Sequence, residues 1–228
     1  MQQLTTVFGI ALTLACYLLF RQLYLKYRNP LLNVVVLSMT VIIAVLLLCG
    51  LSYEDYKQGE AIMTYLLGPA TVSLAVPLYK NRHLVKQYKW AILAGVGLGS
   101  VASMVTALLI ARLGGLPKEV IVSLVPKSAT IPFAAPIAQL MGGDPALATA
   151  FVVATGTFGA LLGLPILTWL KIKNPVARGL AMGTVAHGQG TAMALTEGEQ
   201  QGAMAGMAMG LAGVFTAIIA PILVPLLI

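Results

Sequence analysis

The sequence predicts an all-α integral membrane protein with seven or eight transmembrane segments and a transporter-like organisation. Hydrophobic residues make up 59% of the chain, charged residues make up 9%, and the mean hydropathy is +0.92. Soluble domains carry about 25% charged residues. Apolar runs recur at the length of about 20 residues that crosses a bilayer. Two of these runs are interrupted by prolines, which predicts two broken or re-entrant helices.

Eight apolar runs supply the predicted segments, and 1–228 is expected to form a single polytopic membrane domain. The first run has neither a cationic n-region nor a clear cleavage site, so we predict a span rather than a signal peptide. Cys16 and Cys49 lie within apolar runs and are interpreted as core residues. The runs cover 4–20, 31–51, 61–79, 91–111, 119–141, 146–170, 176–195 and 200–228.

The basic segments predict the orientation in the membrane. Lys and Arg gather in 21–30, 80–90 and 171–178, which the positive-inside rule places in the cytoplasm. The acidic segments 52–60 and 196–200 are predicted to lie outside. The net charge of +7 is therefore assigned to cytoplasmic loops and not to a nucleic-acid partner. We expect a multi-pass protein of the inner (plasma) membrane, in contact with lipid.

The number of runs conflicts with this orientation. Three runs separate 80–90 from 171–178, although two cytoplasmic loops require an even number of crossings. One of the three is therefore not a plain span, and 119–141 is the candidate. Either this run enters the membrane and returns, or the separator 112–118 hides an additional short crossing. Charge counting leaves both arrangements open.

The candidate run contains the sequence PKSATIPFAAP at 126–136. Proline removes a backbone donor and clashes with the preceding turn, so regular helix is not expected here. A related stretch, PATVSLAVP, occupies 69–77. The residues predicted to break helices are Pro69, Pro77, Pro126, Pro132 and Pro136.

The two stretches match at an offset of 59 residues, and the same offset aligns Gly97 with Gly156 in the sequence. A chance match in an Ala-rich chain is one explanation. The favoured explanation is an inverted repeat with units around 61–111 and 119–170, as in many secondary transporters.

Unwound backbone in a membrane is tolerated where it is buried in protein or lines a watery cavity, so the breaks predict a site for a polar solute. Lys127 would either bind an anion such as a carboxylate or snorkel to the membrane edge. The residues predicted to bind substrate at the breaks are Thr71, Ser73, Lys127, Ser128 and Thr130.

A third polar motif, AHGQGTA at 186–192, interrupts a run of small residues. His187 is a candidate for proton coupling, and helix packing is the alternative. Gln189 and Thr191 could donate to a carboxylate. The small residues of 202–213 fit close helix packing or a dimer face, and a homo-oligomer is expected. The sequence contains no catalytic set, metal-ligand spacing or phosphate loop, so we expect neither enzyme activity nor a cofactor.

These motifs resemble the LrgB/CidB family of bacterial membrane proteins over essentially the whole chain. One departure is 129–132, which reads Ala-Thr-Ile-Pro where the family suggests a Val-Thr-Thr-Pro-like run, so a hydroxyl is lost at 131. The matching residues are Leu67-Gly68-Pro69-Ala70-Thr71-Val72, Ala75-Val76-Pro77-Leu78-Tyr79-Lys80, Pro126-Lys127-Ser128, and His187 with Gly190-Thr191-Ala192, together with Tyr53, Tyr56 and Gly59.

The resemblance implies two different functions. One is an antiholin-like role, in which the protein modulates murein hydrolase export and cell lysis with a small membrane partner of the LrgA/CidA type. The other is transport, because relatives include a plastid glycolate/glycerate translocator and bacterial members linked to pyruvate. The matched broken helices favour a secondary carrier of small monocarboxylates (pyruvate, glycolate or glycerate type), with or without proton coupling. The antiholin-like regulator is the alternative.

Overall fold

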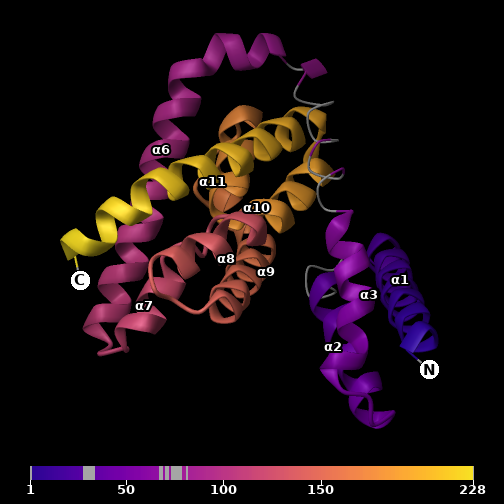
Figure 1. Ribbon diagram of the computed structural model, residues 1–228. Helices are drawn as coiled ribbons and strands as arrows, with labels where there is room; N and C mark the ends of the chain where they lie inside the picture. Colours follow the sequence, from indigo (N-terminus) through magenta and orange to yellow (C-terminus); the bar gives the residue numbers. More distant parts are fainter. Residues whose placement is uncertain are drawn as a thin grey trace. The chain divides into compact units, whose positions relative to one another are not determined.

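The structure is a computed structural model that describes residues 2–27, 34–66, 69, 72, 79–80 and 82–227 (Figure 1). Within these residues the regular elements are all α-helices. The chain forms two compact units, Met1–Ser73 and Leu74–Ile228, and the single membrane domain stays a prediction.

The first unit contains the helices α1 (Gln2–Tyr27), α2 (Val34–Leu48) and α3 (Tyr53–Tyr65). α1 packs against α3, where Gly9 lies against the ring of Tyr56. The hydroxyl groups of Thr13 and Tyr56 are 2.8 Å apart and join the same two helices. A Cβ at position 9 would lie 3.2 Å from Cδ2 of the Tyr56 ring, so the glycine favours the close contact.

α3 begins with a capping box formed by Ser52 and Asp55. The backbone N–H and the hydroxyl of Ser52 donate to Asp55 Oδ2 at 2.9 and 2.7 Å, and the Asp55 N–H donates to Ser52 Oγ at 3.3 Å. The hydrogen bond from the Ser52 hydroxyl, followed by that from the Ser52 N–H, favours the ionised carboxylate and lowers the pKa of Asp55. The capping box therefore marks where the loop after α2 ends.

The second unit contains three long helices: α6 (Arg82–Leu113), α9 (Pro145–Trp169) and α11 (Glu199–Leu227). Shorter elements lie between them: α7 (Lys118–Leu124), α8 (Ile131–Leu140) and α10 (Pro175–Glu197). Among the described residues, four helices are long and apolar enough to cross a membrane, namely α1 and segments of α6, α9 and α11. The chain is a multi-pass membrane protein, and the total of seven or eight spans stays a prediction.

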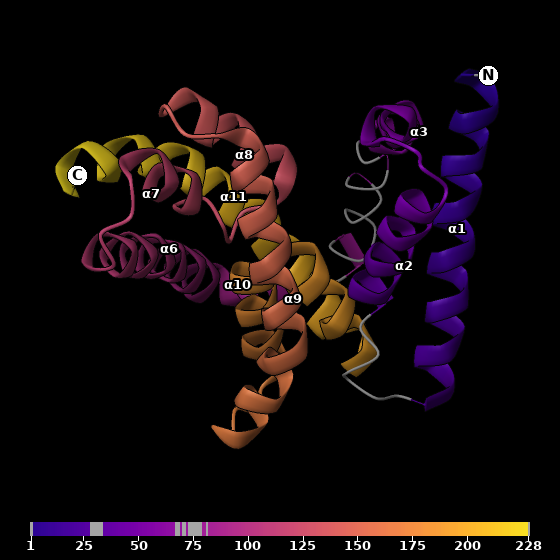
Figure 2. The same ribbon diagram turned by 90° about the horizontal axis from the view of Figure 1, so that it is seen from below.

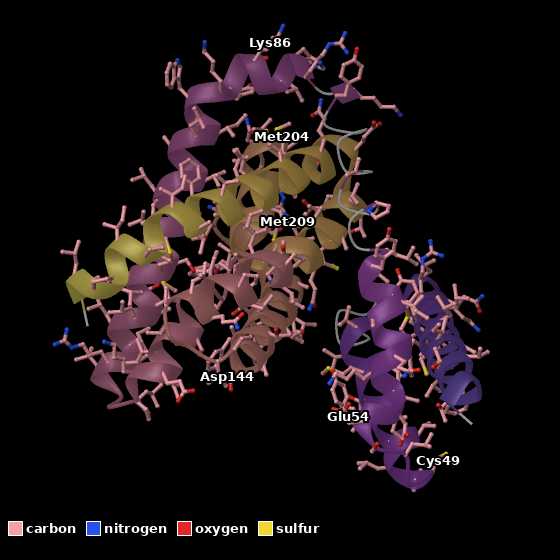
Figure 3. All side chains as sticks on the ribbon, in the orientation of Figure 1. Cys49, Glu54, Lys86, Asp144, Met204 and Met209 are labelled. Atoms are coloured by element: carbon pink, nitrogen blue, oxygen red, sulfur yellow. The ribbon has the colours of Figure 1, made fainter. Side chains whose placement is uncertain are left out.

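α6 and α11 run in the same direction from one end of the unit to the other. At one end Lys80, just before α6, approaches Glu199 at 3.9 Å. At the other end Arg112 donates to the carbonyl of Leu227. Figure 3 shows Lys86 and Asp144 at opposite ends of this unit, with Met204 on α11. We call these the Lys86 end and the Asp144 end.

α7 and α8 form a hairpin that starts and finishes at the Asp144 end. Ser123 Oγ accepts a hydrogen bond from the Asp144 N–H at 2.8 Å, so the turn after α8 lies against α7. α7 packs in one cluster with the last turns of α6 and α11, and both views show it there (Figures 1 and 2). α7 and α8 have 7 and 10 residues, about 10 and 15 Å, too short to span. The run 119–141 is therefore two short helices whose chain returns to α7 at Asp144, and re-entry into the membrane stays a prediction.

The sequence predicted that Pro126, Pro132 and Pro136 break helices, and two of these prolines do not. Pro126 lies in the turn between the two helices and is buried. Pro132 and Pro136, however, lie within α8, so neither breaks a helix. Pro132 occupies the first turn, where backbone N–H groups have no acceptor within the helix. Pro136 removes one internal hydrogen bond from a helix that ends at Leu140.

The other half of the predicted repeat cannot be compared with this hairpin. Pro69 is described and exposed. Pro77, Thr71 and Ser73 lie outside the described residues. The inverted repeat therefore stays a prediction.

α10 is a second hairpin, which opens at the Lys86 end. Arg178 lies near its start and Glu197 at its end, yet Arg178 Nε donates to Glu197 Oε2 at 2.7 Å. In a straight helix these residues would be about 28 Å apart. The reversal occurs at His187, whose φ of 40° and ψ of −126° are not helical. We call 175–186 and 188–197 the first and second arms of α10.

This hairpin corrects the predicted position of 196–200. Glu197 pairs with Arg178 and Glu199 pairs with Lys80, and both cations belong to segments predicted to be cytoplasmic. The acidic segment therefore lies on the same side as these cations, whereas the sequence placed the two on opposite sides. That arrangement was wrong because Asp and Glu contribute little to membrane orientation, and because 176–195 was treated as a plain span.

Glycines bring the second hairpin against its neighbours. A Cβ on Gly179 would lie 2.8 Å from Met204 Cβ of α11, and Gly183 and Gly202 also lie in close contacts between the two helices. Gly213 faces Phe133 of α8, where a Cβ would be 2.9 Å from the ring. These residues of 202–213 therefore serve packing within the chain, which is the first of the two explanations considered for them.

The two hairpins predict a labelling pattern. In a variant lacking Cys16 and Cys49, single cysteines at Lys173 and Gln200 should react with an impermeant maleimide from one side of a membrane vesicle. Single cysteines at Lys118 and Gln139 should react only from the other side. Labelling of Lys173→Cys and Gln200→Cys from opposite sides would show that α10 crosses the membrane.

The Arg178–Glu197 pair is predicted to stabilise the second hairpin. Their side chains are 10% and 26% exposed, and removing one partner of a buried pair costs about 3 kcal/mol. Arg178→Met and Glu197→Gln should therefore each lower the free energy of unfolding in detergent, and Arg178→Met/Glu197→Met should recover part of it. Lys80→Met, which removes an exposed pair, is the control and should change the free energy of unfolding by about 0.5 kcal/mol. Equal effects of Arg178→Met and Lys80→Met would contradict this role.

Candidate functional site

The tips of the two hairpins meet at Val152 of α9. The side chain of Val152 is buried with Ala129 and Ala134 of the α7–α8 hairpin. Its backbone carbonyl accepts a hydrogen bond at 2.9 Å from His187 Nε2 at the tip of α10. Two chain reversals that enter from opposite ends of the unit therefore contact the same residue, which locates the candidate site.

The first tip carries a cluster of one ammonium and two hydroxyl groups, which we call the Lys127 centre. Lys127 Nζ donates to Ser103 Oγ at 3.1 Å and to Ser128 Oγ at 3.4 Å. The two serine hydroxyl groups are 2.7 Å apart. Ser103 belongs to α6, so the centre joins a long helix to the hairpin tip. Ser128 is buried and Lys127 is partly buried.

No described carboxylate neutralises Lys127. Within the described residues the salt bridges involve other cations. Asp144, one of the acids nearest in sequence, accepts the N–H groups of Ala146 and Leu147 at 2.6 and 3.0 Å as the cap of α9. Glu119 is exposed in the first turn of α7. A partly buried ammonium held by neutral hydroxyl groups is suited to bind an anion.

The second tip is held by His187 and Thr191. His187 Nε2 faces a carbonyl oxygen, which can only accept, so Nε2 carries the proton. Thr191 Oγ1 donates to the backbone carbonyl of His187 at 2.8 Å and is buried. Thr191 therefore satisfies a carbonyl at the reversal, and its proton is not available to a substrate in this conformation.

Gln189 is less firmly held. Its Oε1 accepts from Thr157 Oγ1 at 3.4 Å, and its Nε2 donates to the carbonyl of Val153 at 3.5 Å. Both distances are at the long limit for hydrogen bonds. Gly156 makes room for this tip, because a Cβ there would lie 2.7 Å from His187 Nε2 and 3.1 Å from Gln189 Nε2. Gln189 is therefore the polar side chain at this tip that can most readily change partners.

The structure thus brings together several of the residues predicted from the sequence. Lys127 and Ser128 lie in one cluster, and His187, Gln189 and Thr191 lie at the other tip. Thr130 is the N-terminal cap residue of α8, but its side chain makes no capping hydrogen bond. The predicted substrate residues Thr71 and Ser73 lie outside the described part of the chain.

Ser103 and the Arg178–Glu197 pair were not among the residues predicted from the sequence. Ser103 lies in an apolar run that was interpreted as a plain span, and its only signal was a polar residue near Gly97 and Gly99. The ion pair could have been suggested by one basic and one acidic residue flanking a run rich in glycine. Within the described ranges, no group of three or more His, Cys, Asp or Glu residues could hold a metal ion.

Gly156→Ala should disturb the second tip. The added methyl would force His187 away from Val152, and overpacking of this kind costs about 1–3 kcal/mol. The measurement is thermal unfolding of the purified protein in detergent. Gly210→Ala is the matched control, because a Cβ at this helical position would meet nothing within 4 Å, and it should stabilise the protein slightly. Equal behaviour of the two variants would contradict the close contact at Gly156.

Comparison with known proteins places the whole chain in one family. The model of the LrgB-like family matches residues 13–226. The chain is 35% identical over 227 residues to the holin-like protein CidB of Staphylococcus epidermidis, covering 100% of this chain and 97% of the relative. It is 33% identical over 223 residues to the antiholin-like protein LrgB of Bacillus mycoides, covering 97% of each chain.

An uncharacterized protein of Bacillus subtilis, YxaC, is 37% identical over 215 residues, which is 94% of each chain. No solved structure matches the chain. The family match extends over both hairpins and both tips of the candidate site. This protein belongs to the LrgB-like family.

Proposed function

We propose that this protein is a secondary carrier for a small monocarboxylate, of the pyruvate, glycolate or glycerate type. The observation that carries the proposal is the meeting of two hairpin tips at Val152, with a partly buried ammonium at one tip that has no described carboxylate partner. Irregular backbone at membrane depth is tolerated where it lines a cavity or is buried in protein. Carriers built from broken helices bind their substrates at such points.

The charge at the tips supports an anionic substrate. α8 begins at Ile131, directly after the Lys127 centre, and the second arm of α10 begins directly after His187. The N-terminus of a helix carries a partial positive charge. α7 and the first arm of α10 end at the same tips with the opposite partial charge, so the ammonium of Lys127 contributes most of the preference for an anion there. In this proposal Lys127, Ser128 and Thr130 face the carboxylate, and Gln189 faces the remainder of the substrate.

The order of elements supports alternating access. α6 is followed by a hairpin from the Asp144 end, and α9 is followed by a hairpin from the Lys86 end. In each case a long helix crosses the unit, and a hairpin then enters from the end that the helix has reached. The two sets, α6–α8 and α9–α10, would therefore form an inverted-topology pair. Gly97 and Gly156 still correspond in this pairing, although the unit bounds differ from those the sequence suggested. Such pairs allow a central site to open to each side in turn.

The names of the relatives favour a second function. Two relatives are named antiholin-like and holin-like, and these names fit a regulator of murein hydrolase export that acts with a membrane partner of the LrgA/CidA type. A regulator of this kind would require the exposed faces of the protein and not the Lys127 centre. The two functions therefore make different predictions for Lys127.

Uptake of radiolabelled pyruvate or glycolate into proteoliposomes tests the carrier. The protein alone should catalyse uptake, and Lys127→Met should reduce it at least tenfold, because a hydrogen bond to a charged group contributes about 1.5–3 kcal/mol. Lys118→Met, which removes an exposed lysine at the start of α7, is the control and should keep the original rate. An absence of uptake of both compounds, alone and with an added LrgA-type partner, would exclude the monocarboxylate carrier.

The same assay tests proton coupling. An imposed pH gradient should accelerate uptake, and His187→Gln should remove that acceleration if His187 carries the proton. An unchanged response to the gradient in His187→Gln would assign His187 to packing against Val152 alone.

A further inference from the structure

We propose that α6 supplies two of the groups that bind the carboxylate, Ser103 and Ser100. This inference rests on the proposed carrier function and adds a long helix to a site so far assigned to the hairpin tips. Two features support it: the hydrogen-bonding capacity of the Lys127 centre and one buried hydroxyl group next to the centre in α6.

The Lys127 centre has more donors than acceptors. An ammonium has three N–H groups and each serine has one O–H. Lys127 uses two N–H groups on the two serines, and one serine O–H is used in the contact between Ser103 and Ser128. One N–H and one O–H then have no acceptor among the described residues. A carboxylate has two acceptor oxygens and no donor, so it satisfies both remaining groups at once.

Ser100 adds an independent observation. Its side chain is 2% exposed, and its Oγ has no hydrogen-bond partner among the described residues. Residues three apart lie on the same face of a helix, so Ser100 and Ser103 share the face of α6 that carries the centre. A buried hydroxyl without a partner destabilises a protein and requires an explanation. A ligand that reaches from Ser103 toward Ser100 would supply the missing partner.

The two serines have different expected signatures. Ser103→Ala removes a hydrogen bond to Lys127 and should weaken carboxylate binding about fivefold, the equivalent of about 1 kcal/mol. Ser100→Ala replaces an unsatisfied buried hydroxyl with an apolar group, so it should raise the melting temperature of the free protein. The same change should reduce the additional stabilisation by the ligand. Substitution of a residue with only a structural role would not raise the melting temperature of the free protein while lowering the stabilisation by the ligand.

The experiment is a thermal-shift titration of the full chain in detergent with sodium pyruvate. Chloride, inorganic phosphate and the neutral amide of pyruvate are titrated as comparison probes. We expect stabilisation by pyruvate and not by the amide, a weaker effect in Ser103→Ala and Ser100→Ala, and an unchanged effect in Thr106→Ala. Thr106 is the matched control, because it is an exposed hydroxyl residue of α6 that, among the described residues, bonds to carbonyls of its own helix.

The result separates this inference from the carrier function. If the protein takes up pyruvate but Ser103→Ala and Ser100→Ala bind it as the original does, the inference is overturned and the carrier stands. If uptake is absent but carboxylate binding depends on both serines, the binding site stands and the carrier is overturned. Equal stabilisation by chloride, phosphate and pyruvate would show a general anion site and overturn the carboxylate assignment.

Discussion

A chain that reverses direction within a membrane protein must satisfy the backbone groups that the reversal frees, and the second unit is organised around this constraint. At His187 the helix of α10 stops and turns back. Thr191 donates to the carbonyl at the reversal, and the His187 ring donates to the carbonyl of Val152 within α9, which holds the reversal against that helix. These two bonds give hydrogen-bond partners to polar side chains that would be unfavourable without partners in an apolar run. The small residues around them allow the arms to approach α9 and α11.

The base of the same hairpin is held by charge. Arg178 donates to both oxygens of Glu197 and also to Thr168 Oγ1 and the carbonyl of Ile172. One guanidinium group therefore fixes the end of α9, the following loop and both arms of α10. Its planar set of donors suits this task in a way that a lysine would not. The ion pair and the glycine contacts together make α10, α11 and the end of α9 one packed body.

The two tips differ in chemistry, and this difference supports the proposed function. The His187 tip has most of its described polar groups paired, whereas the Lys127 centre has donors that exceed its acceptors. Electrostatic preference for an anion is therefore concentrated at the tip of the α7–α8 hairpin and on the adjacent face of α6. That hairpin is also bounded by Gly115 and Gly142, whose positive φ values of 67° and 83° suit glycine. The first of these glycines follows α6 and the second precedes α9.

The sequence by itself determined the all-helical membrane class, the polar stretch at 126–130, and the motif around His187. These follow from local properties: apolar length, proline, and polar residues within an apolar run. Only the tertiary structure decided that 176–195 is a hairpin, because Arg178 and Glu197 are distant in sequence and meet through a single reversed residue. Only the tertiary structure decided that Ser103 joins Lys127, since a serine in an apolar helix carries no sign of its partner. Both depend on contacts between segments far apart in the chain, which composition and periodicity do not specify.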